Sequence, residues 1–322
     1  MSLLGYVIKR ILVGIPLVLL IAILNFVIVH SAPGDPVSYM ISGVDLASPG
    51  FVQQKRHQLG LDQPLYIQLL IYLNNLFHGD LGFSFIFHRP VVDVIGERLV
   101  ATLMLTLTAF MIAVVCGVFL GVYASKRPYS AGDTSFTLFG LALWSMPTFW
   151  IGMLAIIIFS VDLKMFPIFG FQDIGLTGLA SVINIGWHLI LPAAALGLGM
   201  FAMYTRLVRA NMLEILKQDY ITTAWAKGCD ERDVFYKHAL RNALLPLITM
   251  MGFQVSFLFT GALLIETVFA WPGIGRLLYD SIVRRDYLIV QSVFLVVSIL
   301  TIAANLLADI VYAFLDPRIR FK

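Results

Sequence analysis

Charged residues are scarce in this sequence. Asp, Glu, Lys and Arg make up 13% of its 322 residues, and hydrophobic residues make up 59%, whereas soluble domains carry about 25% charged residues. Six runs contain no charged residue, and each can supply the roughly 20 apolar residues that cross a hydrocarbon core: residues 11–31, 99–125, 134–161, 174–205, 242–265 and 287–308. The composition predicts an integral membrane protein.

Motifs for catalysis and cofactor binding are also missing. The sequence has no G-x-x-x-x-G-K-[ST] loop, so it has no recognisable means of hydrolysing a nucleotide. It has no Ser/His/Asp set and no metal-ligand cluster at a characteristic spacing, and its two cysteines, Cys116 and Cys229, suggest neither a disulfide nor a metal framework. We therefore expect no catalytic residue, no metal site and no cofactor bound by this chain. The mild net charge of +3 argues against a nucleic-acid partner.

Ionisable residues are absent from the middle of the apolar runs. Glu266, Asp309 and Arg206 stand at the ends of runs, and the polar Asn25 and Asn305 are more typical of hydrogen bonds between helices. Ion-coupled carriers usually keep an ionisable residue at mid-membrane. This pattern disfavours a stand-alone secondary carrier or channel. That alternative, and a membrane anchor without transport activity, remain open at this point.

The distribution of positive charge predicts the topology. Of the 22 Lys and Arg residues, 14 fall in the N-terminus, the 126–127 turn, the 206–241 stretch and the C-terminal tail, four fall in the alternate connections, and four fall in the long 31–98 connection. Because positive charge near helix ends is retained in the cytoplasm, we expect six transmembrane helices with both termini cytoplasmic. The spanning segments must satisfy their backbone internally, so the fold class is an all-α membrane bundle.

The N-terminal run is expected to be a retained helix and not a cleaved signal, because it is too long and Pro33 follows it. We divide the chain into a transmembrane helix at 1–30, an extracytoplasmic segment at 31–98, a five-helix core at 99–315 and a cytoplasmic tail at 316–322. PGDP at 33–36 should end the first helix. Apolar residues at helical spacing between Pro64 and Gly79 predict an amphipathic helix that packs on the bundle or lies in the membrane interface, with contact to substrate as the alternative.

Two smaller patterns concern helix packing and the inner membrane boundary. Gly117 and Gly121 form a G-x-x-x-G pair, which should allow two helices to approach closely. Arg206 and Arg209 lie on one helix face at the inner boundary, where we expect them to snorkel toward phospholipid.

One polar stretch separates two apolar runs. This 219–246 segment reads DYITTAWAKGCDERDVFYKHALRNALLP. Its pattern predicts a helix from Asp219 to Lys227, a break at Gly228 with a positive φ angle, and a second helix that starts near Asp230. An interfacial linker that only turns the chain round remains an alternative, but the two-helix pattern favours an element that docks to another protein.

The 219–246 segment resembles the cytoplasmic loop of ABC importer permeases, E-A-A-x-x-x-G-x9-I-x-L-P. Ala224, Gly228 and Leu240 match this pattern. Thr222, Thr223, His238 and Arg241 depart from it. The segment is closer to the B-type permeases of dipeptide, oligopeptide and nickel importers, with Trp225 in place of an Arg. Further ordered blocks carry the same resemblance: PGDP at 33–36, GDLGFS at 79–84, MPTFW at 146–150, ETVFAWPGIGRL at 266–277 and NLLADIVYAFLDPRIR at 305–320.

This resemblance implies a type I ABC importer permease fold and half of a heterodimeric pore in a bacterial inner membrane. The implied partners are a C-type permease, two cytoplasmic ATPase subunits that use ATP and Mg, and an extracytoplasmic substrate-binding protein. The implied cargo is a dipeptide or oligopeptide, with nickel or another small solute as the alternative. The implied ATPase-coupling residues are Asp219, Tyr220, Ala224, Lys227, Gly228, Asp230, His238, Leu240, Arg241 and Asn242.

A second candidate region is the turn that contains Glu266, Trp271, Pro272 and Gly273. This turn is a candidate pore mouth or gate, in which Glu266 attracts a peptide amino terminus or a metal cation. The alternatives are an ordinary Pro-Gly turn with Trp271 as an anchor at the membrane interface, and a Glu266 that caps a neighbouring loop.

Overall fold

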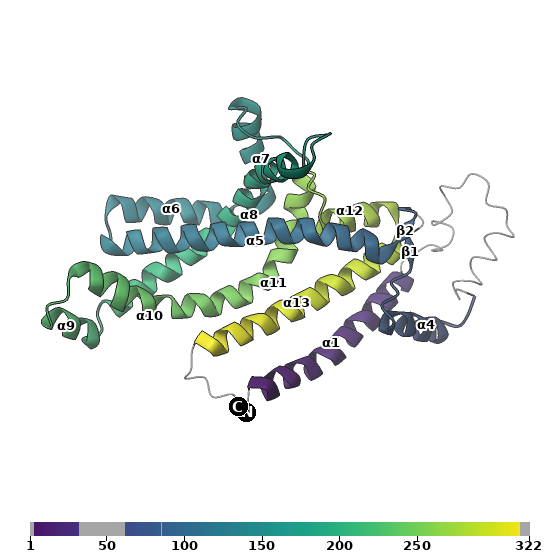
Figure 1. Cartoon of the computed structure of the whole chain (residues 1–322), viewed down its shortest axis with the longest axis horizontal. Coiled ribbons are helices and arrows are strands. Elements are labelled where there is room, and N and C mark those ends of the chain that lie inside the picture. The colour runs from purple at the N-terminus through teal and green to yellow at the C-terminus, as the bar shows by residue number, and fades with distance from the viewer. Residues whose placement is uncertain (1–2, 32–61, 85, 316–322) are drawn as a thin grey trace. The chain divides into compact units, whose positions relative to one another are not determined.

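The computed structural model describes residues 3–31, 62–84 and 86–315 of the chain (Figure 1). Almost all regular structure in these residues is helical, as the composition predicts. The chain divides into two compact units, and α5 and α13 each contribute to both. The tail at 316–322 and the PGDP stretch at 33–36 lie outside the described residues.

The first unit comprises Met1–Ala101 and Gly273–Ala303. It contains α1 (Leu3–Ser31), α4 (Leu65–Phe77), α12 (Ile274–Arg284), the start of α5 (Val91–Lys126) and most of α13 (Tyr287–Leu315). Two short antiparallel strands, β1 (Phe83–Ser84) and β2 (Arg89–Pro90), precede α5. The Asn25 side chain of α1 donates to the Gln291 carbonyl of α13 over 2.7 Å, which is the helix-to-helix role expected for it.

The helix predicted between Pro64 and Gly79 is confirmed as α4. Pro64 precedes the first turn, and Gly79 adopts a φ of +74° just beyond the end. The ring of Tyr72 stacks on Phe26 of α1 at 5.8 Å between centroids. The helix therefore packs on α1, while Leu65, Tyr66, Leu70 and Phe77 remain exposed.

The second unit comprises Thr102–Pro272 and Ala304–Lys322. Its helices are the rest of α5, the end of α13, α6 (Ala131–Ser145), α7 (Thr148–Ala155), α8 (Gly178–Ile215), α9 (Asp219–Ala226), α10 (Arg241–Ala243) and α11 (Leu245–Val268). Two π-helical stretches, η1 (Ile156–Asp162) and η2 (Asp233–Leu240), continue α7 and lead into α10. The packing of α8 against α6, α7 and α11 makes α8 the centre of this unit.

The close contact between α5 and α8 confirms the packing role predicted for the G-x-x-x-G pair. A Cβ atom on Gly117 would lie 2.5 Å from the Cβ of Tyr204, and one on Gly121 would lie 2.8 Å from the carbonyl oxygen of Thr205. Real Cβ atoms do not approach this closely, so only glycine permits this approach of α8 to α5.

Among the described residues, four helices are long and apolar enough to cross a membrane: Val7–Ser31, Val91–Lys126, Gly178–Ile215 and Tyr287–Ala308. Ala131–Ser145 and Thr148–Asp162 make a fifth span if the bent pair is counted as one crossing. The remaining apolar run, 242–265, is largely covered by the 24-residue α11. The count of six crossings therefore stays a prediction.

The run 134–161, expected to supply one span, is divided in the structure. Its two helical parts meet at an angle of 107°, and the break falls at Met146 and Pro147. Met146 is extended, with a ψ of 140°, because the ring of a following proline disfavours the helical region. Pro147 also has no N–H to continue the helix.

Candidate functional site

The 219–246 segment forms two helical arms joined by a tight turn. The first arm, α9, ends at Ala226, and Gly228 follows with a φ of +78°. The amide of Gly228 donates to Trp225 O over 2.9 Å, and the amide of Cys229 donates to Ala224 O over 3.2 Å. These bonds satisfy carbonyls that would otherwise be left free at the end of the helix. The predicted break at Gly228 is confirmed, and the second arm begins at Glu231.

One face of the 219–246 segment is buried against the helices that flank it. Ile221 and Ala224 of α9 and Val234, Phe235 and Ala239 of η2 share one apolar cluster with side chains of two longer helices. These are Val122 of α5 and Tyr204, Val208 and Met212 of α8. An apolar face that is fully buried stabilises an element by removing its surface from water. A linker that only turns the chain round gives no reason for this packing.

Polar contacts hold the two arms to each other and to α8. The Asn242 amide donates to the Tyr220 hydroxyl over 3.1 Å, which joins the start of α9 to α10, and to the carbonyl of His238 over 3.0 Å. Asn211 of α8 donates to the carbonyl of Ala243 over 3.1 Å. These contacts therefore tie the end of the second arm to the start of α9 and to α8.

The opposite face of the 219–246 segment is exposed. Of the predicted coupling residues, Ala224 is buried and His238 and Leu240 are half-buried, while the others are exposed: Asp219, Tyr220, Lys227, Gly228, Asp230, Arg241 and Asn242. Trp225, which the sequence leaves unexplained, is 48% exposed on α9. The structure thus brings the predicted residues together on one packed element and leaves aromatic and charged side chains free to contact another molecule.

The candidate pore-mouth residues lie differently from the coupling residues. Glu266 is fully buried, and the hydroxyl of Thr102 donates to its Oε1 over 2.6 Å. Trp271 is fully buried as well, with its ring edge-on to Phe171 at 4.8 Å. The alternative of Trp271 as a membrane-interface anchor is therefore wrong, because the ring packs inside its own unit. In this conformation neither side chain has a surface to offer a substrate.

The other two members of that turn take structural positions here. Pro272 is half-buried, and Gly273 is buried and caps the N-terminus of α12. A role of this turn as a pore mouth or gate stays a prediction.

One ion pair overturns the expectation for Arg209. Its Nε donates to Asp133 Oδ1 over 2.6 Å, and one terminal nitrogen donates to Asp133 Oδ2 over 2.6 Å. Arg209 is thus bound to the start of α6 and does not snorkel to lipid. Asp133 is not among the residues predicted from the sequence, although Ser130 and Asp133 form the S-x-x-D signature of a helix start. The Ser130 hydroxyl accepts a hydrogen bond from the Asp133 amide.

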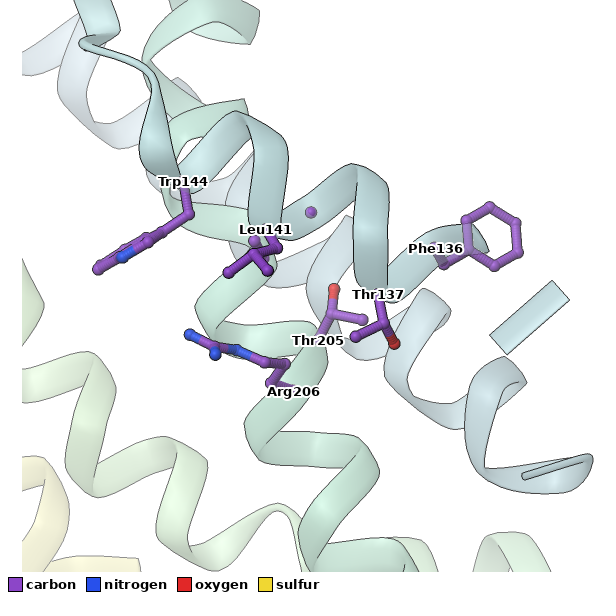
Figure 2. Close-up of a pocket in the computed structure, with 8 residues that line it drawn as sticks. Phe136, Thr137, Leu141, Trp144, Thr205 and Arg206 are labelled. Atoms are coloured by element: carbon purple, nitrogen blue, oxygen red, sulfur yellow. The ribbon is translucent and has the colours of Figure 1, made fainter. Parts of the chain in front are cut away.

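Arg206 is exposed, unlike Arg209. Figure 2 shows its side chain with Leu141 and Trp144 at a pocket whose lining residues come from α6 and α8. Leu141 and Trp144 are each 47% exposed. This position is compatible with the snorkelling predicted for Arg206.

Comparison with known proteins accounts for nearly the whole chain. Residues 113–321 match the family described as binding-protein-dependent transport system inner membrane component, and residues 3–106 match the N-terminal family of such membrane components. The chain is 40% identical to the oligopeptide transport system permease protein AppB of Bacillus subtilis, over 98% of this chain and 99% of that protein.

Two further relatives are similar over equally complete lengths. The chain is 41% identical to the glutathione transport system permease protein GsiC of Escherichia coli, over 99% of this chain and 100% of that protein. It is 43% identical to a putative peptide transport system permease protein of Brucella abortus, over 98% of each. The chain therefore belongs to the family of inner membrane components of binding-protein-dependent transport systems.

Proposed function

We propose that this chain is a permease subunit of an ATP-driven ABC importer for dipeptides and oligopeptides. In this role it forms half of the translocation pore, and a C-type permease forms the other half. Its relatives include oligopeptide, glutathione and putative peptide permeases. The observation that carries the proposal is the 219–246 segment, which is packed on α5 and α8 on one side and exposes Tyr220 and Trp225 on the other.

The division of work between subunits follows from the residues present. The sequence has no P-loop, so two cytoplasmic ATPase subunits supply ATP hydrolysis with Mg. Their closure on ATP displaces the 219–246 segment, and because α8 runs directly into α9 through a three-residue turn, this displacement reaches the membrane helices. An extracytoplasmic binding protein delivers the cargo, and both termini of the chain lie in the cytoplasm of a bacterium.

Purification of the chain from its native membrane tests the assembly. We expect a P-loop ATPase and a second permease to co-purify, and the complex in liposomes to take up a labelled dipeptide or oligopeptide when ATP and the binding protein are supplied. Uptake of nickel without uptake of peptide would show that the cargo is a metal and not a peptide. Uptake by this chain alone, driven by an ion gradient, would refute the proposal in favour of a secondary carrier.

A matched pair of variants tests the docking face. Trp225→Asp places a charge on the exposed face of α9, and Arg127→Asp places the same charge at an exposed residue of the turn between α5 and α6, outside the 219–246 segment. We expect only Trp225→Asp to reduce the amount of ATPase that co-purifies. Equal retention of the ATPase by both variants and the wild type would remove α9 from the docking face.

A further inference from the structure

The short turn between α5 and α6 is bound at both of its ends to other helices of the second unit. Residues 127–130 connect the last residue of α5, Lys126, to the first turn of α6, which contains Asp133. Lys126 contacts the second arm of the 219–246 segment, and Asp133 contacts α8. The turn therefore touches both the 219–246 segment and the helix that leads into it.

The contact at the α5 end is a cation over two aromatic rings. The ammonium of Lys126 lies 5.5 Å from the ring centre of Phe235 and 4.9 Å from that of Tyr236. The two rings are themselves edge-to-face at 5.5 Å. Phe235 is buried and Tyr236 is exposed. Lys126 therefore makes a cation–π contact where the buried face of η2 meets its exposed face. This contact lies on the segment that we assign to coupling.

The contact at the α6 end is an ion pair with several supports. Arg209 binds both carboxylate oxygens of Asp133, and Asp133 is only 3% exposed. The amide of Tyr129 also donates to Asp133 Oδ2 over 2.8 Å, and the Arg209 guanidinium lies 5.6 Å from the Tyr129 ring centre. Tyr129 has a φ of +63°, which is uncommon for a residue other than glycine. Three of these contacts thus reach Arg209 of α8, and the fourth holds Tyr129 of the turn to Asp133 of α6.

We propose that Lys126, Asp133 and Arg209 are positioning residues that make the start of α6 move together with the 219–246 segment. The inference rests on the proposed importer function and adds a second connection beside the direct one through α8. In this arrangement a displacement of the segment reaches α6 through Lys126 and the turn. The Asp133–Arg209 pair holds the start of α6 to α8, so that the two helices move together. These three residues transmit motion and need not touch ATP, ATPase or cargo.

The test compares uptake per ATP hydrolysed in the complete reconstituted complex. Lys126→Met removes the cation from an exposed side chain and leaves most of its length, and Arg127→Met, at the next position, which is also exposed, is the matched control. We expect Lys126→Met to keep the ATPase bound and to lower uptake per ATP by about tenfold, within the range usual for coupling between sites. Lys126→Arg should restore uptake per ATP, because a guanidinium also binds aromatic faces.

The ion pair is tested by a double-mutant cycle in the same assay. We expect Asp133→Asn and Arg209→Gln each to lower uptake per ATP. The double variant should be no worse than either single variant, because each single variant already removes the same ion pair. If the ion-pair variants fail to fold, the Lys126 series decides the question alone.

The outcomes separate this inference from the function on which it rests. A wild-type complex without ATP-dependent peptide uptake refutes the proposed function. A working wild-type complex in which Lys126→Met retains normal uptake per ATP, or loses its ATPase, overturns only the role of the turn. The same holds if Arg127→Met is as defective as Lys126→Met.

Discussion

At the scale of single residues, the second unit depends on places where a side chain is missing. Gly117 and Gly121 face Cβ and backbone atoms of α8, and these atoms cannot rotate away if a Cβ atom is added. Gly96 lies on the same helix, but a Cβ atom there would meet nothing within 4 Å. Substitution by alanine should therefore destabilise the chain at Gly117 and Gly121 but not at Gly96, although all three residues of α5 are glycines.

Gly117→Ala should destabilise the chain by about 1–3 kcal/mol, the usual cost of overpacking. Gly96→Ala should be neutral or should stabilise the chain by up to about 1 kcal/mol, because alanine is the better helix former. Thermal unfolding of both variants in the same detergent measures the difference. Equal melting temperatures for the two variants would contradict the close approach of α5 and α8.

Asp286 is a residue whose protonation should affect stability. It is 6% exposed and accepts hydrogen bonds from the Ser84 hydroxyl over 2.5 Å and from the Ile289 amide over 3.3 Å. Burial raises the pKa of Asp286 above its ordinary value, and these two bonds only partly oppose the effect. A carboxyl whose pKa is higher in the folded than in the unfolded chain binds its proton more tightly when folded. The stability that comes from this tighter proton binding is complete below the pKa of Asp286 in the unfolded chain. It is lost as the pH rises through the pKa of Asp286 in the folded chain.

Asp286→Asn should remove this pH dependence while keeping a group of the same shape. We expect the melting temperature of the wild type minus that of the variant to increase as the pH falls from about 7 to about 4. Measurements by thermal unfolding in detergent at several pH values provide the test. A difference that stays constant or shrinks on acidification would show that the carboxyl is not held in a buried site.

At the scale of elements, the turn at Gly228 sets the angle between the two arms of the 219–246 segment. Its φ of +78° is a conformation that L-residues avoid, and a Cβ atom there would meet nothing within 4 Å. Substitution should therefore cost backbone strain alone, without any clash. This makes Gly228 a site where the conformation of the turn can be varied while the packing of both arms is kept.

Gly228→Ala should cost about 1–2 kcal/mol, and Gly228→Val should cost more, because a β-branched residue is a clear outlier at positive φ. Gly228→Asn should cost less than either, because asparagine tolerates this conformation. Hydrogen exchange of the amides in 219–240 measures the order, with faster exchange expected for Val than for Ala and for Ala than for Asn. Equal exchange in all three would show that the turn does not need a left-handed residue.

The elements also show how far the sequence determines this structure. Uncharged runs, the positive φ at Gly228 and the packing of Gly117 could all be predicted, because each depends on local composition or spacing. The sequence MPTFW contains the proline that breaks the helix at 146–147. The long uncharged run around it nevertheless predicted one continuous span. The pairing of Asp133 with Arg209 spans 76 positions, and the burial of Trp271 depends on Phe171. Neither contact has a local signal that names its partner.

At the scale of the whole molecule, the charge distribution makes a prediction about sidedness. Arg127 and Lys217 belong to the connections expected inside, and Lys164 and Arg284 belong to those expected outside. All four side chains are exposed, so a cysteine at each would be open to a reagent. The native Cys116 and Cys229 are both free thiols and must first be replaced by alanine.

Single cysteines at these four positions should separate into two pairs. In intact cells, a membrane-impermeant maleimide should label Lys164→Cys and Arg284→Cys and should leave Arg127→Cys and Lys217→Cys unlabelled until the membrane is opened, because positively charged connections are retained inside. Labelling of position 127 or 217 in intact cells would reverse the topology. Labelling of all four would mean that the number of crossings between them is not the expected one.

The length of α8 has a mechanical consequence. Its 38 residues extend over about 57 Å, well beyond a hydrocarbon core of about 30 Å. From Arg206, the first charged residue of α8, to Ile215 the helix continues for about 15 Å, so it carries α9 away from its uncharged part. Because α8 is this long, a tilt of the helix by about 10° around one end moves its other end by about 10 Å. A modest reorientation at one side of the membrane is thereby enough to shift the opposite side by the width of a helix.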